Sequence, residues 1–198
     1  MNSAAKLLSA IPASVRKAAS EQDLAKDAVL FAQGTKPKSM HCVLFGEIRL
    51  LRTTSTGAEI LLQRSREGFV AESSLDQAAY HCNAVATTRS RVLAIPRPAF
   101  QKALDDPKFR GVWIAYINAE LRRARAQSER LRLRTARERI VHFIETEGGN
   151  GTINLGLSKK AWAAELGLTH EALYRALSTM IKARELYEPR AGMLSLVR

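Results

Sequence analysis

The hydrophobic period of this sequence changes once along the chain, and that change limits the folds open to it. Residues 24–100 alternate apolar and polar positions in short runs, whereas from Pro98 onward the period is helical. The alternating runs are 28–34, 40–54, 59–65 and 83–96, with turn formers at Gly34, Gly46, Gly57 and Gly68. Short strands at this spacing, followed by helices, predict an α+β fold with an antiparallel sandwich or barrel.

The helical half begins with a short helix that ends before Asp106-Pro107, because proline disfavours helix at the residue before it. A long helix at about 108–134 follows. Its apolar or small residues recur at a 3-4-3-4-3 spacing, as in a coiled coil: Ile114, Ile117, Leu121, Ala124, Ser128 and Leu131. Arginines leave this apolar stripe narrow, which favours a homodimer interface. The alternative is a helix packed on its own domain.

A single glycine near the C-terminus separates two amphipathic helix patterns in "LSKKAWAAELGLTHEALYRALSTM", residues 157–180. Ser158 and Thr169 are good N-caps, and Gly167 can adopt the positive φ that a tight turn needs. This spacing predicts a helix-turn-helix, whose second helix enters the major groove of DNA. An ordinary helical hairpin is the alternative.

Hydrogen-bonding side chains gather at the start of the predicted second helix. Arginine pairs with guanine and glutamate with cytosine, whereas lysines suit phosphate contacts that position the protein. A hairpin at about 185–197 would add a wing against the phosphate backbone. The candidate DNA-binding residues are Lys159, Lys160, Thr169, His170, Glu171, Tyr174 and Arg175.

The net charge of +12 favours a polyanionic partner. Residues 106–134 carry 8 basic against 3 acidic side chains, but residues 135–198 carry 9 against 7, so the DNA assignment depends on the motif. No apolar run approaches the roughly 20 residues that span a bilayer, so no membrane partner is expected. Residues 1–20 read as one amphipathic lead-in helix without secretory organisation, and we expect a cytoplasmic protein.

These motifs together resemble the bacterial Crp/Fnr superfamily of transcription regulators, from about residue 24 to 197. "VLFAQGTKPKSMHCVLFGEIRL" is similar to the early strands, "GFVAESSL" to the start of the effector cassette, "RVLAIPRPAF" to the strand and helix after it, and "THEALYRAL" to the recognition helix. The resemblance implies a cyclic-nucleotide-binding-like β-roll of jelly-roll type at 1–106, a dimerisation helix at 107–134 and a winged helix-turn-helix at 135–198. His170 stands where many members have Arg, so the operator sequence is not carried over.

The resemblance also implies partners. They are double-stranded DNA read as an inverted repeat, a second copy of the chain, RNA polymerase and an unidentified small-molecule effector. No glycine-rich phosphate loop or G-x-S-x-G elbow is present, and we do not expect an enzyme. The alternatives are a protein–protein adaptor and a metal- or haem-dependent redox sensor with the same fold.

The family's cyclic-nucleotide binders hold the ribose with a Glu and the cyclic phosphate with an Arg-Ser pair. The resemblance does not imply that this chain binds the same effector. Glu72 matches the Glu, although Ala71 precedes it where Gly is usual, but "YHCN" at 80–83 replaces the pair. A buried phosphate would lack donors, so cyclic AMP is not expected. Without an N-terminal cysteine cluster, no iron–sulfur cluster is expected either. The candidate effector-pocket residues are Glu72, His81, Cys82, Gln127 and Ser128.

Both cysteines, Cys42 and Cys82, directly follow a histidine. Neighbours on a strand point to opposite faces, so neither pair predicts a metal site. Reduced, buried, structural thiols are the expectation in this setting. Haem ligation by His81 or Cys82 and a Cys42–Cys82 redox switch are the alternatives.

Overall fold

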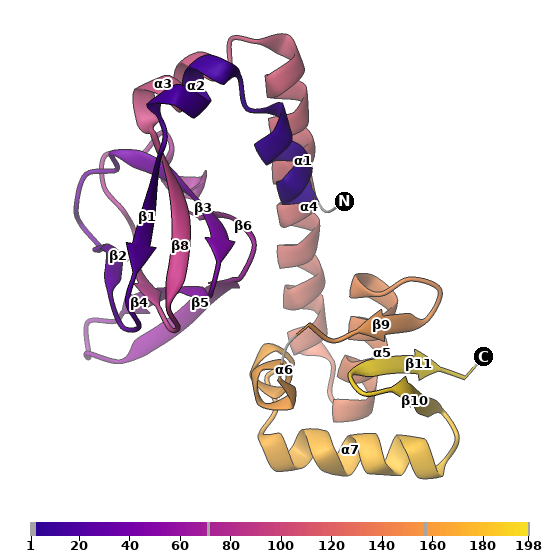
Figure 1. The fold of residues 1–198 in the computed structure, drawn as a ribbon. Helices are drawn as coiled ribbons and strands as arrows, with labels where there is room; N and C mark the ends of the chain where they lie inside the picture. Colours follow the sequence, from indigo (N-terminus) through magenta and orange to yellow (C-terminus); the bar gives the residue numbers. More distant parts are fainter. Residues whose placement is uncertain (1–2, 71, 157, 198) are drawn as a thin grey trace. The chain divides into compact units, whose positions relative to one another are not determined.

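The structure, a computed structural model, describes residues 3–70, 72–156 and 158–197. Its elements form two compact units, Met1–Ala119 and Glu120–Arg198, and the division falls within one long helix. Each unit has its own hydrophobic core. Strands dominate the first unit and helices the second (Figure 1), so the predicted α+β fold is confirmed.

The first unit contains helices α1 (Ser3–Ala10), α2 (Ala13–Ala18) and α3 (Arg97–Ala103), the 3-10 turn η1 (Glu72–Ser74) and the start of α4 (Pro107–Arg132). Its strands are β1 (Ser20–Leu24), β2 (Val29–Phe31), β3 (Ser39–Phe45), β4 (Ile48–Thr53), β5 (Glu59–Ser65), β6 (Gly68–Val70), β7 (Asn83–Ala86) and β8 (Ser90–Pro96). They make two antiparallel sheets, ordered β1-β8-β3-β6 and β2-β7-β4-β5.

The alternation of β3 explains how these layers stack. Met40 and Cys42 face a helix-covered core that also holds Phe100 and Trp113, while Val43 faces the core between the two sheets. Successive side chains on a strand point to opposite faces, so a single strand supplies both cores.

The strand runs in the sequence are divided by turns that only certain residues allow. At Gly46, between β3 and β4, φ is +90° and an added Cβ would lie 2.2 Å from Ser90 Oγ and 2.6 Å from the Arg89 carbonyl oxygen. A side chain at this position would therefore collide with the neighbouring turn.

The expectation of one lead-in helix was wrong. Two short helices, α1 and α2, occupy this segment, and Pro12 stands between them as the residue before α2. Proline has no backbone N–H and interrupts helical hydrogen bonding. The apolar positions are nevertheless used as expected, since Leu7, Ile11 and Val15 are buried.

The second unit contains the end of α4 and helices α5 (Ala136–Glu147), α6 (Lys159–Glu165) and α7 (His170–Lys182). Its strands are β9 (Thr152–Asn154), β10 (Leu186–Arg190) and β11 (Met193–Leu196), in the order β10-β11-β9. A capping box starts α5: Thr135 Oγ1 accepts from the Glu138 N–H, and Glu138 accepts from the Thr135 N–H. Trp162, Leu166 and Leu173 lie fully buried at the centre of its core.

Within the ranges given above, none of the helices combines the length and apolarity that crossing a bilayer requires.

Candidate nucleic-acid interface and effector region

The turn between α6 and α7 has the geometry that its sequence predicts. Ser158 Oγ accepts from the Ala161 N–H at 3.2 Å, and Thr169 Oγ1 accepts from the Ala172 N–H at 3.1 Å. Gly167, between the two helices, has a φ of +63°. Both N-caps and the glycine turn are therefore present, and they fix where each helix starts.

A single arginine connects this turn to the end of α4. The Arg139 guanidinium donates to the carbonyl oxygens of Leu166 at 3.1 Å and Gly167 at 3.0 Å. It also donates to the carbonyl oxygens of Leu133 at 3.0 Å and Leu131 at 3.4 Å. Sequence reasoning did not identify Arg139, because its partners are backbone groups, which leave no residue signature.

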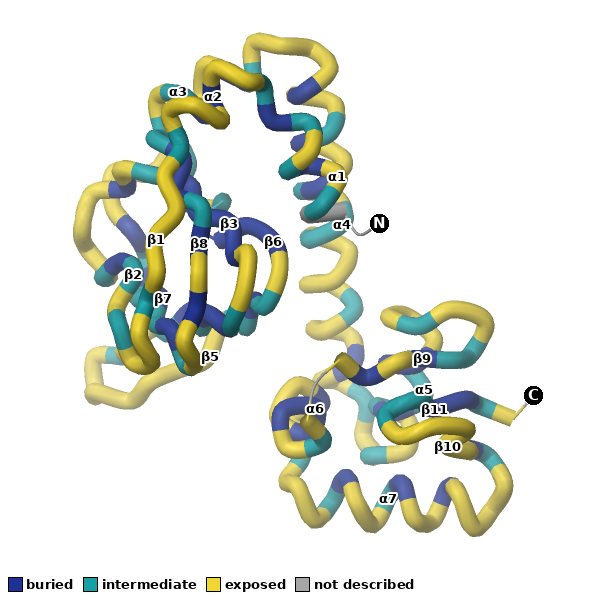
Figure 2. The backbone as a smooth tube through the Cα atoms, viewed as in Figure 1, coloured by how far each residue is buried: buried dark blue, intermediate teal, exposed yellow. Residues whose placement is uncertain are grey.

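Helix α7 presents one polar face to solvent. Figure 2 shows buried and exposed residues alternating along it, with Leu173, Leu177 and Met180 on the buried side. The predicted base-contacting residues are all on the exposed side: His170, Glu171, Tyr174 and Arg175. Their donors and acceptors are accordingly accessible to a ligand.

Three of these side chains interact with their neighbours. The His170 and Tyr174 rings meet edge to face, with centroids 4.5 Å apart. A hydrogen bond from its own backbone N–H, followed by one from Thr169, lowers the pKa of Glu171 below its ordinary value. Glu171 is thus an ionised acceptor at the helix N-terminus, where a negative charge is favoured.

The two lysines of α6 differ in their environment. Lys159 Nζ is half-buried, lies 3.5 Å from Glu188 Oε2 on β10 and sits 5.5 Å from the centroid of the Tyr174 ring. Lys160 is exposed. The structure therefore brings all seven candidate DNA-binding residues onto α6, α7 and the turn between them, six of them exposed.

The apolar stripe of α4 is largely uncovered in the single chain. Ile114 is 52% exposed, and Leu121 and Leu131 are each 46% exposed. Ala124 and Ser128 are exposed as well, and only Ile117 packs partly into a core. Large exposed aliphatic side chains along one helix are typical of an interaction surface.

The candidate effector residues are divided between the two units, with Glu72, His81 and Cys82 in the first. Glu72 begins η1. Burial raises the pKa of the Cys82 thiol, and the nearby negative charge of Glu72 also raises it. His81, which precedes Cys82, is half-buried. Gln127 and Ser128 are exposed on α4, in the second unit, and Ala71 lies outside the described residues.

Both cysteines are free and buried. Burial raises the pKa of the Cys42 thiol to about 12 and also raises that of Cys82. Cys42 belongs to the helix-covered core and Cys82 to the core between the sheets, so the two thiols lie in different cores. In the parts of the chain that the structure describes, no three His, Cys, Asp or Glu side chains are grouped to hold a metal ion.

An aromatic group lines the core between the sheets. The Phe31 ring stacks on Tyr80 with centroids 3.9 Å apart, and His41 stacks against Phe31 at 5.8 Å. His41 is 6% exposed, its Nδ1 has no hydrogen-bond partner, and burial lowers its pKa to about 4. The ring is therefore neutral near pH 7.

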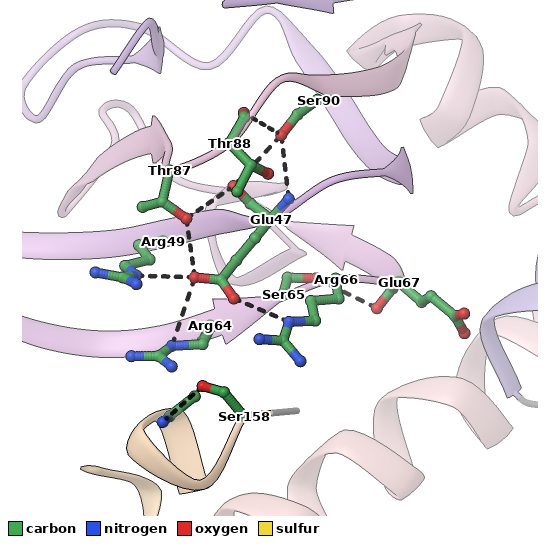
Figure 3. Close-up of polar contacts among 11 residues, drawn as sticks. Glu47, Arg49, Arg64, Ser65, Arg66, Glu67, Thr87, Thr88, Ser90 and Ser158 are labelled. Atoms are coloured by element: carbon green, nitrogen blue, oxygen red, sulfur yellow. Dashed lines mark hydrogen bonds and ion pairs between the residues drawn. The ribbon is translucent and has the colours of Figure 1, made fainter. Parts of the chain in front are cut away.

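Sequence reasoning missed a charged group at the start of β4, the Glu47 cluster, which consists of Glu47, Arg49, Arg64, Arg66 and Thr87 (Figure 3). Glu47 accepts from Arg49 Nε at 3.0 Å, Arg66 Nε at 2.9 Å and Thr87 Oγ1 at 2.8 Å, and Arg64 Nε lies 3.7 Å away. Burial alone would raise the pKa of Glu47, but these hydrogen bonds and the charge of Arg64 lower it. The sequence signal for this cluster is the Arg-x-Arg spacing at 64–66, which does not reveal that Glu47 is the shared partner.

Comparison with known proteins identifies one family and several similar structures. Residues 21–106 match the cyclic nucleotide-binding domain family. No curated protein sequence matches the chain. The fold is similar to FixK2 from Bradyrhizobium japonicum, with 24% identity, a TM-score of 0.65, and 91% of this chain and 93% of that one covered.

Two further structures are similar over most of the chain. A mutant of CooA from Carboxydothermus hydrogenoformans has 21% identity and a TM-score of 0.72, with 99% of this chain and 91% of that one covered. A candidate cAMP-binding regulatory protein from Silicibacter pomeroyi DSS-3 has 26% identity and a TM-score of 0.60, with 97% and 90% covered.

Proposed function

We propose that this chain is a sequence-specific DNA-binding transcription regulator that acts as a homodimer. The proposal starts from its cyclic nucleotide-binding domain and from its likeness to regulators of the Crp/Fnr fold. The similar structure from Silicibacter pomeroyi is described as a regulatory protein, which supports a regulator, and the comparisons do not favour an adaptor. Buried thiols with raised pKa values do not favour a redox sensor, because the thiolate is the reactive form. We expect it to act in the cytoplasm.

The observation that carries the proposal is the exposed face of α7. Its inward side is anchored by Leu173, Leu177 and Met180, while four hydrogen-bonding side chains occupy the first turns of its outward side. A recognition helix reads base edges with its N-terminal residues. Arg175 suits guanine and Glu171 suits cytosine, with His170 and Tyr174 as further contacts.

The uncovered apolar stripe of α4 supports the homodimer. Exposed Ile114, Leu121 and Leu131 would be buried by the same stripe of a second copy. A two-fold dimer would then place two recognition helices in successive major grooves, so the operator should be an inverted repeat with half-sites about one helical turn apart.

An effector other than cyclic AMP remains part of the proposal. The sequence at 80–83 has no Arg-Ser pair for a cyclic phosphate. The aromatic stack of Phe31, Tyr80 and His41 makes the interior between the sheets apolar, which suits a small uncharged ligand better than a dianion. RNA polymerase is the partner expected for the DNA-bound form.

Selection from random duplex DNA by the purified full-length protein tests the proposal. Enrichment of a palindrome is expected, and its affinity should fall steeply between low and moderate salt as phosphate contacts release counterions. Enrichment of a non-palindromic site would contradict the proposed dimer but not the proposed sequence-specific DNA binding. Absence of any salt-sensitive DNA binding would refute the regulator.

A further inference from the structure

Two arginines stand directly opposite each other on the second sheet. Arg49 on β4 pairs in register with Arg64 on β5. Like charges at directly opposed positions destabilise a sheet, because their Cβ atoms are only about 5 Å apart. The pair therefore needs a compensating negative charge.

Glu47 compensates the pair only in part. Its carboxylate interacts with three guanidinium groups, those of Arg49, Arg64 and Arg66. Throughout the described residues, no second carboxylate lies within 4.0 Å of either Arg49 or Arg64. Arg49 and Arg64 thus carry two positive charges against the single negative charge of Glu47, which Arg66 also contacts, so the pair keeps an excess of positive charge.

The terminal nitrogens of the pair are directed away from the carboxylate. Arg49 and Arg64 both approach Glu47 with Nε, and Figure 3 shows the two guanidinium groups on the same side of it with their Nη atoms pointing outward. The side chains are 37% and 21% exposed, so these donors are recessed but reachable. Thr87 Oγ1 donates to Oε1, the same carboxylate oxygen that Arg49 and Arg64 approach, which holds Glu47 in place and orients the guanidinium groups in advance.

We infer that Arg49 and Arg64 form a binding site for the phosphate group of a small molecule. A phosphate carries up to two charges and three oxygens that accept hydrogen bonds, and guanidinium forks match this geometry. The site lies on the outer face of the sheet, because Arg49 alternates with Ile48 and Leu50, which face the core between the sheets. It is therefore separate from Cys82, which lies in that core.

Titration of the full-length protein with inorganic phosphate at constant ionic strength tests the site, followed by the Nε–Hε signals of arginine in a ¹⁵N-labelled sample and by calorimetry. We expect saturable binding with shifts confined to the Glu47 cluster. Arg49→Gln and Arg64→Gln should each weaken the affinity at least about tenfold, because each removes a charge-assisted hydrogen-bonding fork. Arg91→Gln is the matched control, since Arg91 is an arginine of the same unit paired with Asp23 and Glu21.

A second titration with adenosine monophosphate, and with adenosine as its uncharged counterpart, identifies the source of the phosphate. Tighter binding of the nucleotide than of phosphate, with no binding of adenosine, assigns the site to phosphorylated small molecules. Equal affinities assign it to free phosphate. A response that does not saturate, or equal weakening by Arg91→Gln, overturns the inference. None of these measurements involves DNA, so failure here leaves the proposed regulator untouched.

Discussion

Arg175 lies on the exposed face of α7, one turn after Glu171. Arg175→Ala should reduce discrimination between the selected operator and single-base variants of it by roughly 1–3 kcal/mol, the value of one bidentate pair. Affinity for unrelated DNA should change little. Competition binding measures both quantities, with Lys182→Ala at the far end of α7 as the control. An unchanged sequence preference would show that the recognition face is misassigned.

The titration of a single residue, His41, should make the stability of the first unit depend on pH. Its pKa is about 4 in the folded protein against 6.5 as the ordinary value, because the ring is buried. Above pH 6.5 both states are neutral; as pH falls from 6.5 to 4, only the unfolded state takes up the proton. Stability should therefore fall by about 3 kcal/mol across that window.

Urea unfolding of the first unit at several pH values measures this dependence. His41→Phe removes the titrating imidazole and should reduce the slope between pH 6.5 and 4, leaving the part that carboxylates such as Glu47 contribute near pH 4. If the variant kept the slope of the unmodified chain, the proton uptake would belong to another group.

At the scale of an element, the helix-turn-helix depends on Gly167. Its φ of +63° disfavours any side chain, and an added Cβ would lie 2.8 Å from Leu131 Cδ2 and 3.2 Å from Arg139 Nη1. Gly167→Ala should cost about 2 kcal/mol, from backbone strain plus the weakened hydrogen bonds of Arg139. Gly192→Ala, also at positive φ but 3.7 Å from its nearest atom, should cost only about 1 kcal/mol. Chemical unfolding of the second unit, followed by Trp162 fluorescence, compares them. Equal costs would mean that Arg139 adds nothing.

The elements that sequence predicts well are those whose signals are local. Ser158, Gly167 and Thr169 each act on residues within three positions, and all three occur as expected. Strand β1 was not predicted, because "SEQDL" has no apolar alternation and is held by pairing with β8, about 70 residues later. The Glu47 cluster needs the register of β4 with β5, which no single run of sequence encodes.

At the scale of the whole molecule, we expect the apolar stripe of α4 to hold two chains together in the proposed dimer. Leu121→Glu should convert the dimer to a monomer, because a charge in a coiled-coil contact loses its hydration without a partner. Sedimentation measures the mass. Ala115→Glu adds the same charge at an exposed position beside the stripe and should leave the dimer intact. A Leu121→Glu protein that kept the mass of two chains would rule out this interface.

The four carbonyl contacts of Arg139 have a consequence for how the second unit opens. They join the last turn of α4 to the turn between α6 and α7, so neither segment can detach without breaking the same side-chain contacts. Native-state hydrogen exchange should show the amides of Leu133 and Leu168 exchanging with one shared opening free energy, as members of one cooperative foldon. In the Arg139→Ala chain, the end of α4 should exchange faster and independently of the helix-turn-helix.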